Sequence, residues 1–343
     1  MKALVYEDTN KIRLVEKNRP KIQDPKDAIV KVKMSSICTS DLHIIKGAVP
    51  KAKKGITLGH EFVGEIVETG SEVKTLKKGD RVSANCETFC GECYFCKNGF
   101  VNNCQRGGWL LGCQIDGCQA EYVRVPYADN GLTVIPDNLS YKNALLVGDI
   151  LSSGYFAALM CEIKNGDTIA IIGSGPVGLC AMQCARILGA GKIIAIDINE
   201  KRLEIARQNK LADIFINPQK EDCEKIIKEN TNSLGADGTI EASGSEEGFE
   251  LAWKIARANS CVGIVAMYEQ DQNLPLPKMY GKNLTFKTGG VDAIHCKKLL
   301  DYISEGKLNT DFLISEEIKL ENIVEGYEKF QDKNNNILKI AVV

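Results

Sequence analysis

The stretch from about Asp149 to Gly290 alternates short apolar runs with helical stretches, and this alternation limits the possible folds more than any other feature. Strands are expected at 168–172, 192–197, 213–216, 238–241 and 261–267, and helices up to residue 188 and at 200–209, 222–230 and 247–258. Repeated strand–helix units favour a parallel, doubly wound sheet. The fold class is therefore expected to be α/β, with residues 149–290 as one domain.

The rest of the chain has a different pattern. Residues 1–148 contain short Val/Ile-rich runs such as 28–32 and 62–67, separated by glycine and proline, which is typical of an irregular β-rich domain. After Gly290 the chain becomes helix and loop and finishes on an apolar strand at 337–342. Because a closing strand needs a sheet to join, we expect residues 291–343 to return to the first domain.

A glycine-rich turn stands where the first strand of the alternating region ends. It reads G-S-G-P-V-G, and its candidate cofactor-binding residues are Gly173, Gly175, Pro176, Val177 and Gly178. Between a strand and a helix, these glycines permit a tight turn, close approach of the backbone to a pyrophosphate, and packing of helix on strand. The turn predicts a dinucleotide site.

Asp197 ends the second strand, about twenty residues beyond the glycines, where a carboxylate can accept hydrogen bonds from ribose hydroxyls and repel a 2′-phosphate. This position favours NAD over NADP. Asp197 could instead cap the helix that begins near Asn199. Lys201 and Arg202 lie close enough to keep the use of NADP possible.

Four cysteines form a compact group in the β-rich region: Cys90, Cys93, Cys96 and Cys104. Four thiolates with no place for water make a closed, structural Zn²⁺ site. The C-x2-C-x2-C opening also occurs in iron–sulfur proteins, but the bacterial ferredoxin pattern continues after three residues with Cys-Pro, which this chain lacks. Zinc is therefore preferred. Cys86 is a possible alternate ligand, or it belongs to the strand that ends nearby.

A second group of candidate ligands is spread more widely. Cys38 and His60 offer a thiolate and an imidazole, and the chain has only three histidines. Asp149, at the junction of the two domains, is the best candidate for a third ligand. Mixed Cys/His/carboxylate ligands leave room for a substrate oxygen, so this site is expected to be catalytic. The alternatives are a buried thiol for Cys38, a core histidine for His60 and a helix cap for Asp149.

Composition excludes some partners. With 43 Lys+Arg against 45 Asp+Glu, the chain has no positive field to recruit nucleic acid or an anionic membrane. No run approaches the roughly 18 apolar residues that are expected to cross a bilayer, and the N-terminus lacks the apolar core of a secretory signal, so a cytoplasmic protein is expected. In a chain of this kind, 14 cysteines do not indicate disulfides.

Several motifs together resemble one family over essentially the whole chain. They are the G-H-E-x2-G-x5-G-x2-V pattern that starts at Gly59, the C-x-S-D-x-H segment that starts at Cys38, the four-cysteine group and the glycine-rich turn. The chain resembles the zinc-dependent medium-chain alcohol dehydrogenases, and in motif it is most similar to bacterial secondary-alcohol and butanediol-type members. This resemblance implies a GroES-like catalytic domain joined to a Rossmann domain, with two zinc ions and NAD.

The resemblance also implies roles for single residues. Cys38, His60 and Asp149 would hold the catalytic zinc, with Glu61 able to approach it when substrate and water exchange. Asp41 would orient the zinc-bound histidine. Ser40 would accept the alcohol proton, His43 would relay it, and Trp109 would line the substrate pocket. Thr39 departs from the family, since some members have a basic residue there near the pyrophosphate, and Lys339 is the candidate substitute.

The expected reaction is reversible oxidation of an alcohol, in the first place a secondary alcohol or diol, to a ketone or aldehyde by hydride transfer to NAD. A polyol or amino-alcohol dehydrogenase is the nearest alternative, and a non-catalytic NAD-binding protein is the distant one. Trp109 could also be plain core. Bacterial members are commonly tetramers, so a homo-oligomer, a tetramer or a dimer, is implied.

Overall fold

A computed structural model describes residues 1–343, with the side chain of residue 333 excepted. The chain forms two compact units, which are Met1–Ser152 with Asp292–Val343, and Ser153–Val291. The unit boundary after Ser152 lies beyond the expected domain boundary at residue 149. Asp149 therefore belongs to the same unit as the other candidate ligands of the catalytic metal.

The first unit is rich in β-structure. Its strands are β1 (Lys2–Asp8), β2 (Lys11–Glu16), β3 (Ala28–Ser36), β4 (Phe62–Thr69), β5 (Arg81–Ala84), β6 (Tyr122–Val125), β7 (Leu132–Val134), β14 (Ile314–Ile318) and β15 (Lys339–Val342). The main sheet has the order β14-β15-β3-β4-β5-β7, with β6 also paired to β3, and β1 pairs with β2. The GroES-like, β-rich character expected from the sequence is confirmed.

Short helices connect these strands. They are α1 (Thr39–Ile45), α2 (Tyr94–Lys97), α3 (Ala128–Gly131), α4 (Tyr141–Ala144), α11 (Cys296–Ser304) and α12 (Ile323–Gln331). Single turns are η1 (Val101–Asn103), η4 (Asp311–Leu313), η5 (Leu320–Asn322) and η6 (Lys333–Asn335), and η2 (Val147–Leu151) is a π-helix.

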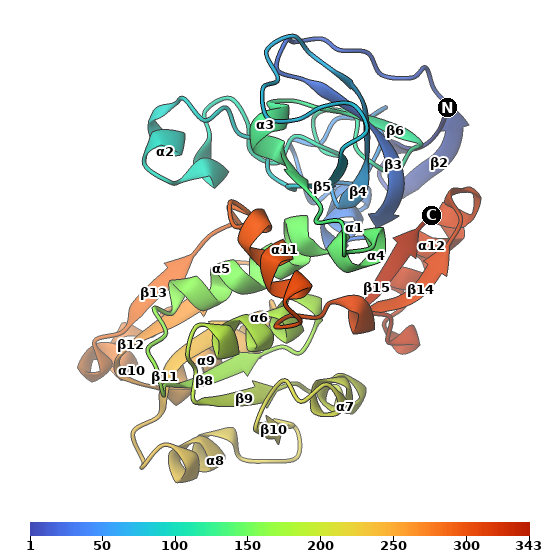
Figure 1. Ribbon diagram of the computed structural model, residues 1–343. Helices are drawn as coiled ribbons and strands as arrows, with labels where there is room; N and C mark the ends of the chain where they lie inside the picture. The colour runs from blue at the N-terminus through green and yellow to red at the C-terminus, as the bar shows by residue number, and fades with distance from the viewer. The chain divides into compact units, whose positions relative to one another are not determined.

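The C-terminal strand closes the main sheet. β15 pairs antiparallel with the end of β3, where Ala341 lies opposite Ser36, and it is drawn in red in Figure 1. All four residues of β15 are buried. The expected return of the tail to the first sheet is therefore correct, and it brings residues near the C-terminus next to the segment that follows β3.

The second unit is the parallel α/β part. Its strands are β8 (Thr168–Ile172), β9 (Lys192–Ile196), β10 (Ile214–Ile216), β11 (Ala236–Glu241), β12 (Ala256–Ile264) and β13 (Thr285–Thr288). Its helices are α5 (Ser152–Met160, whose first residue still belongs to the first unit), α6 (Pro176–Ile187), α7 (Glu200–Gln208), α8 (Cys223–Asn230), α9 (Glu246–Ile255) and α10 (Leu276–Met279), with the single turn η3 (Tyr280–Lys282).

All neighbouring strands of this sheet are parallel, in the order β10-β9-β8-β11-β12-β13. Ala170 and Ile172 pack in one core with residues of α8 and α9. Ile171, on the opposite face of β8, lies beside Gly178 of α6, since a Cβ there would be 3.7 Å from its Cγ2. Helices therefore cover both faces, as expected for a doubly wound sheet.

The helical stretch Tyr141–Met160 corrects one expectation. By length and composition alone it is apolar enough to cross a membrane, whereas no such segment was expected from the sequence. Within the protein, however, 83% of this apolar window is buried. Its apolar residues are therefore explained by burial in the protein core, and the stretch is only weak evidence for a membrane span.

Helix α9 passes into β12 with no intervening loop, so its last carbonyl groups need partners outside the helix. The Lys282 ammonium donates to the carbonyl oxygens of Trp253, Lys254 and Ala256 at 2.9, 2.6 and 2.7 Å. Burial lowers the pKa of Lys282 below its usual value. The Lys282 side chain therefore caps the C-terminal end of α9.

We predict that Lys282→Met lowers the free energy of unfolding by about 1–3 kcal/mol, because partly buried carbonyl groups lose a charged donor. Urea unfolding checks this prediction. The matched control is Lys278→Met on the short helix α10, at an exposed position, which should change stability by less than about 0.5 kcal/mol. Equal effects of the two substitutions would contradict the capping role.

Candidate functional site

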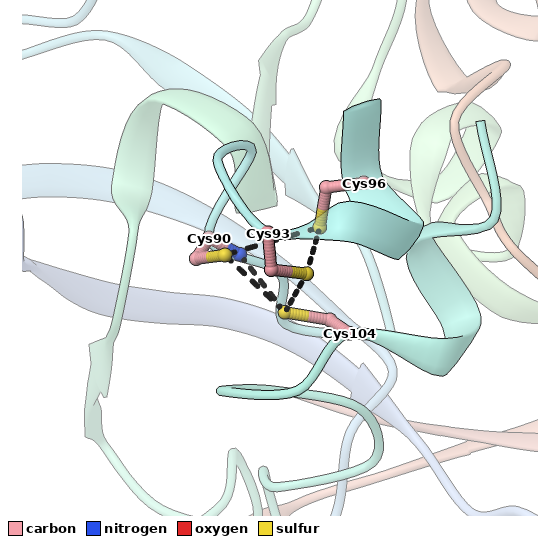
Figure 2. A group of neighbouring side chains, drawn as sticks. All are labelled: Cys90, Cys93, Cys96 and Cys104. Atoms are coloured by element: carbon pink, nitrogen blue, oxygen red, sulfur yellow. Dashed lines mark hydrogen bonds between the residues drawn. The ribbon is translucent and has the colours of Figure 1, made fainter. Parts of the chain in front are cut away.

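Four cysteines lie together in the segment that contains α2 and η1. The sulfur atoms of Cys90, Cys93, Cys96 and Cys104 converge, as Figure 2 shows. Backbone N–H groups of Cys90 and Arg106 point at Cys104 Sγ at 3.3 and 3.4 Å. Backbone N–H groups of Cys96 and Gln105 lower the pKa of Cys93 to about 6. The loop therefore stabilises the Cys93 thiolate, whereas burial raises the pKa of Cys96 to about 12.

The sulfur positions fit a tetrahedral ion. Neighbouring Sγ atoms are 3.5–3.9 Å apart, as between Cys93 and Cys96 at 3.5 Å and between Cys90 and Cys96 at 3.9 Å. Thiolates about 2.3 Å from a Zn²⁺ centre would be separated by about 3.8 Å, whereas a disulfide needs about 2.05 Å. Cys86 is not a member of this group, so its alternate role as a ligand is not supported.

A second convergent group occupies the core of the first unit. One ligand atom from each of Cys38, His60, Glu61 and Asp149 lies within 4.8 Å of the others, and all four residues are buried. Asp149 Oδ2 is 3.3 Å from His60 Nε2 and 3.6 Å from Cys38 Sγ. Ligands about 2.0–2.3 Å from Zn²⁺ would be separated by about 3.3–3.5 Å, so this group also fits the metal.

Three separate segments supply these ligands. Cys38 is the N-cap of α1, His60 and Glu61 directly precede β4, and Asp149 lies in the π-helix η2. The backbone of η2 is held by a hydrogen bond from the Cys86 N–H to the Gly148 carbonyl, 3.1 Å long. Asp149 lies within this π-helix and not at its N-cap, so the alternative that Asp149 caps a helix is wrong.

A bound cation would stabilise the charged residues of this group. Burial works to lower the pKa of His60, but the charge of Asp41 and a hydrogen bond to Asp149 outweigh it and raise this pKa well above its usual value. Burial works to raise the pKa of Asp149, but its hydrogen bond to His60 outweighs this and lowers it. A thiol and two buried carboxyl groups face only His60 and one lysine, and a divalent ion would neutralise the excess of negative charge.

Lys339 corrects a prediction. It was expected to pair with the cofactor pyrophosphate, but its side chain is 1% exposed and donates to Glu61 Oε1 at 2.8 Å and to the Ile37 carbonyl at 3.0 Å. Burial works to lower the pKa of Lys339, but Cys38, Glu61 and Asp149 raise it. The ammonium is therefore held as the partner of Glu61 and is not available to a phosphate.

Asp41 orients the histidine. Its Oδ1 atom lies 3.3 Å from His60 Nδ1, and its Oδ2 atom accepts hydrogen bonds from the Cys38 N–H and the Tyr327 hydroxyl, at 3.1 and 2.9 Å. A carboxylate therefore lies beside Nδ1, while Nε2 faces Asp149. The sequence did not indicate Tyr327, because it stands 286 residues away on α12 and belongs to no motif.

The remaining candidates of the catalytic unit surround the same group. The Ser40 hydroxyl is 3.5 Å from Cys38 Sγ, and His43 lies on α1 one turn further along. The Trp109 ring contacts the His60 ring edge to face, with centroids 5.6 Å apart, and also packs against a hydrophobic core. Trp109 is thus both a core residue and a neighbour of a ligand, so its pocket role stays a prediction.

The glycine-rich turn has the shape of a phosphate cradle. Gly173 has φ +93°, and a Cβ on Gly178 would stand 1.8 Å from the Gly173 carbonyl oxygen. Pro176 and Val177 begin α6, whose N-cap is Gly175. β8 and β11, between which the strand order reverses, end beside this turn, and ligands of such sheets bind at this point. Gly173 therefore makes the tight turn, and Gly178 lets α6 pack closely against it.

Arg202 and Asp197 flank this cradle. A Cβ on Gly175 would be 3.7 Å from a guanidinium nitrogen of Arg202, whose Nε is buried without a partner among the described residues. Asp197 accepts from the backbone N–H of Ser174 and of Asn199 at 2.6 and 2.7 Å. Asn199 itself caps α7, so the alternative that Asp197 is the helix cap is wrong.

A doubly wound sheet with this glycine-rich turn, joined to a β-rich unit with two groups of zinc ligands, defines a zinc-binding, nucleotide-dependent dehydrogenase. Models of protein families agree with this class. Residues 24–137 match the alcohol dehydrogenase GroES-like domain, and residues 176–303 match the zinc-binding dehydrogenase model.

Similar proteins identify the family. An alcohol dehydrogenase of Cupriavidus necator is 35% identical, over 100% of this chain and 98% of its own length. The structure of alcohol dehydrogenase TADH from Thermus sp. ATN1 is 35% identical with a TM-score of 0.92, covering 100% of this chain and 99% of that chain. A putative zinc-binding dehydrogenase of Sinorhizobium meliloti, solved with NADP, is 26% identical with a TM-score of 0.88, covering 100% and 98%. The chain belongs to the zinc-dependent medium-chain alcohol dehydrogenase family.

We predict that Lys339→Met lowers the free energy of unfolding of the zinc-loaded protein by about 3–5 kcal/mol, because it leaves Glu61 buried without its counter-charge. Urea unfolding measures the effect. The double variant Lys339→Met/Glu61→Gln should recover part of the loss, since it removes both charges.

The control for this pair is Lys329→Met, which breaks an exposed ion pair with Glu316 and should cost less than about 1 kcal/mol. If Lys339→Met costs no more than this control, Lys339 does not neutralise Glu61 in solution.

Proposed function

We propose that this zinc-dependent, NAD(P)-dependent alcohol dehydrogenase oxidises a secondary alcohol or a diol reversibly to a ketone or aldehyde, with Cys38, His60 and Asp149 as the ligands of the catalytic zinc. The observation that carries this proposal is the convergence of a thiol, an imidazole and a carboxylate beside a hydroxyl group, all within one unit. Three protein ligands leave a coordination position for a substrate oxygen.

The oxidation releases a hydride, which passes to the nicotinamide, and a proton, which passes to the protein. When bound, Zn²⁺ lowers the pKa of an oxygen acid such as water from about 16 to about 7 and stabilises negative charge on the oxygen. In this proposal Ser40 accepts the alcohol proton and His43 passes it toward solvent. Asp41 holds the His60 ring in place, and Glu61, tied to Lys339, stays within reach of the ligand group.

The four-cysteine group has a structural role in this proposal. Its four sulfur ligands leave no position for a substrate. It connects segments that have little regular structure of their own, since α2 has four residues and η1 has three. The expected homo-oligomer stays a prediction, although β13 is the edge strand of its sheet and offers unpaired backbone groups to a second copy.

We predict that Cys38→Ser reduces kcat/KM for alcohol oxidation on the order of 10³-fold or more, because several kcal/mol of charge stabilisation are lost with the metal. Zinc content should fall from two ions to one per chain, while NAD binding, followed by fluorescence titration, should be unchanged.

Cys223→Ser is the matched control, since this buried cysteine of the second unit belongs to neither ligand group. It should keep two zinc ions and nearly full activity. An active Cys38→Ser variant with a single zinc ion would overturn the proposed catalytic site.

For the cofactor we propose NAD in preference to NADP, because the Asp197 carboxylate lies beside the glycine-rich turn through its bond from the Ser174 N–H. We predict that Asp197→Ser lowers the ratio of kcat/KM with NAD to kcat/KM with NADP by about 10-fold or more, since it removes an acceptor for the ribose and a charge that repels phosphate. Steady-state kinetics with both cofactors measures the ratio. An unchanged ratio would remove Asp197 from cofactor selection.

A further inference from the structure

Two cysteines of the second unit lie close together, and neither belongs to the two groups of metal ligands. Cys161 directly follows α5, and Cys261 lies on β12. The Cys261 thiol donates to the carbonyl oxygen of Met160 at 3.1 Å, and this carbonyl belongs to the peptide bond that leads into Cys161. The hydrogen bond joins residues 101 positions apart, so only the fold brings the two cysteines together.

The sheet leaves space for the Cys161 side chain. Gly238 on β11 lies opposite Cys261 in the parallel register, and Gly263 lies two residues further along β12, on the same face as Cys261. A Cβ on Gly238 would stand 3.3 Å from Cys161 Cβ, and a Cβ on Gly263 would stand 3.2 Å from Cys161 Sγ. Both distances are shorter than an ordinary van der Waals contact. The two glycines therefore make the gap in which the Cys161 thiol lies beside Cys261.

A lysine lies beside the two sulfur atoms. Lys287 on β13 is opposite Gly263, and its ammonium pairs with the carboxylate of Glu162, the residue that follows Cys161. A hydrogen bond to Glu162 raises the pKa of Lys287, and the charges of both cysteines act in the same direction. A cation next to a cysteine stabilises its thiolate, which is the reactive form of the side chain. The surroundings of the pair therefore favour reaction at sulfur.

The two thiols differ in reactivity. A hydrogen bond with Cys161, together with the charge of Lys287, lowers the pKa of Cys261 against the opposing effect of burial and of Glu162. The same hydrogen bond, together with burial, raises the pKa of Cys161 well above its usual value. Cys261 is 9% exposed and Cys161 is 6% exposed. Cys261 is therefore the better nucleophile and the more accessible sulfur, and Cys161 lies where it can react with Cys261 in a second step.

We propose that Cys161 and Cys261 form a site of reversible oxidation, at which hydrogen peroxide converts the two thiols into a disulfide. The Cys261 thiolate attacks one peroxide oxygen and the O–O bond breaks. Sulfur keeps one hydroxyl as a sulfenic acid, and the other leaves as hydroxide and takes up the thiol proton to become water.

The second step closes the disulfide. The Cys161 sulfur attacks the Cys261 sulfur, the S–S bond forms, and the S–O bond breaks. The hydroxyl leaves with the proton of Cys161 as a second water. Two electrons have then passed from the sulfur atoms to the peroxide oxygens, and a reducing thiol such as dithiothreitol returns them. The site is separate from alcohol oxidation and does not rest on it.

The test treats zinc-loaded protein with a limited amount of hydrogen peroxide, alkylates the remaining thiols in denaturant and maps the disulfides by mass spectrometry. We expect a cross-link between the peptides of Cys161 and Cys261 that dithiothreitol removes, while two zinc ions stay bound per chain. The internal control is Cys223, which is also 6% exposed but whose pKa burial raises to about 11. The pair should be oxidised about 10-fold faster than Cys223 or more, because the thiolate is the nucleophile.

Three variants test the order of the steps. Cys161→Ser should stop the reaction at the sulfenic acid of Cys261, which dimedone traps, and Cys261→Ser should leave Cys161 reduced. Lys287→Met should slow the oxidation several-fold, because the thiolate loses its neighbouring cation. The matched control is Lys278→Met, at an exposed position of the same unit, which should leave the rate unchanged. A role of the two cysteines in packing alone would give none of these differences.

The first measurement uses the unsubstituted protein, so a variant that fails to fold does not block the test. A cross-link that forms only after zinc is lost or in denaturant overturns the proposal, and so does oxidation of Cys223 ahead of the pair. Trapping of Cys161 in place of Cys261 overturns the order of the steps, and equal rates for Lys287→Met and Lys278→Met overturn the role of the lysine. Failure of alcohol oxidation would leave this inference standing.

Discussion

The buried negative charge around Asp149 is the constraint on which the rest of the catalytic unit depends. A thiol and two carboxyl groups share a space from which water is largely excluded, and such groups are costly unless they are paired or bind a metal. Lys339 neutralises Glu61, and Asp41 lies 3.3 Å from His60, so that the group of Cys38, His60, Glu61 and Asp149 is left with one unmet requirement, a cation. The zinc ion is thus part of the stability of this unit as well as of its chemistry.

The fold meets this requirement by bringing distant segments together. Cys38 follows β3, His60 precedes β4, and these two strands pair along most of their length. The C-terminal strand β15 joins the end of β3, and that pairing carries Lys339 to Glu61. The same sheet that forms the hydrophobic core therefore sets the spacing of the ligands. Small shifts in this sheet would misplace ligands whose separations must hold to a few tenths of an ångström.

The second unit separates cofactor binding from metal chemistry. Its sheet is covered on both faces and supports the glycine-rich turn, beside which Arg202 and Asp197 lie. Specificity for the alcohol then depends on residues close to the metal ligands. Members of one fold can therefore share metal and cofactor motifs and differ in substrate.

The sequence by itself determined the strand–helix alternation, the glycine-rich turn and the two sets of ligand residues, because these depend on local periodicity and short-range spacing. It also indicated that the tail returns to the first sheet. Only the tertiary structure decided that Lys339 is buried against Glu61, that Asp149 sits inside a π-helix and that Tyr327 supports Asp41. The contacts of Lys339 with Glu61 and of Tyr327 with Asp41 join residues 278 and 286 positions apart, and such contacts leave no local pattern. The stretch 141–160 is a further example. Its composition fits both a membrane span and a protein core, and the burial of its side chains in the structure favours the protein core.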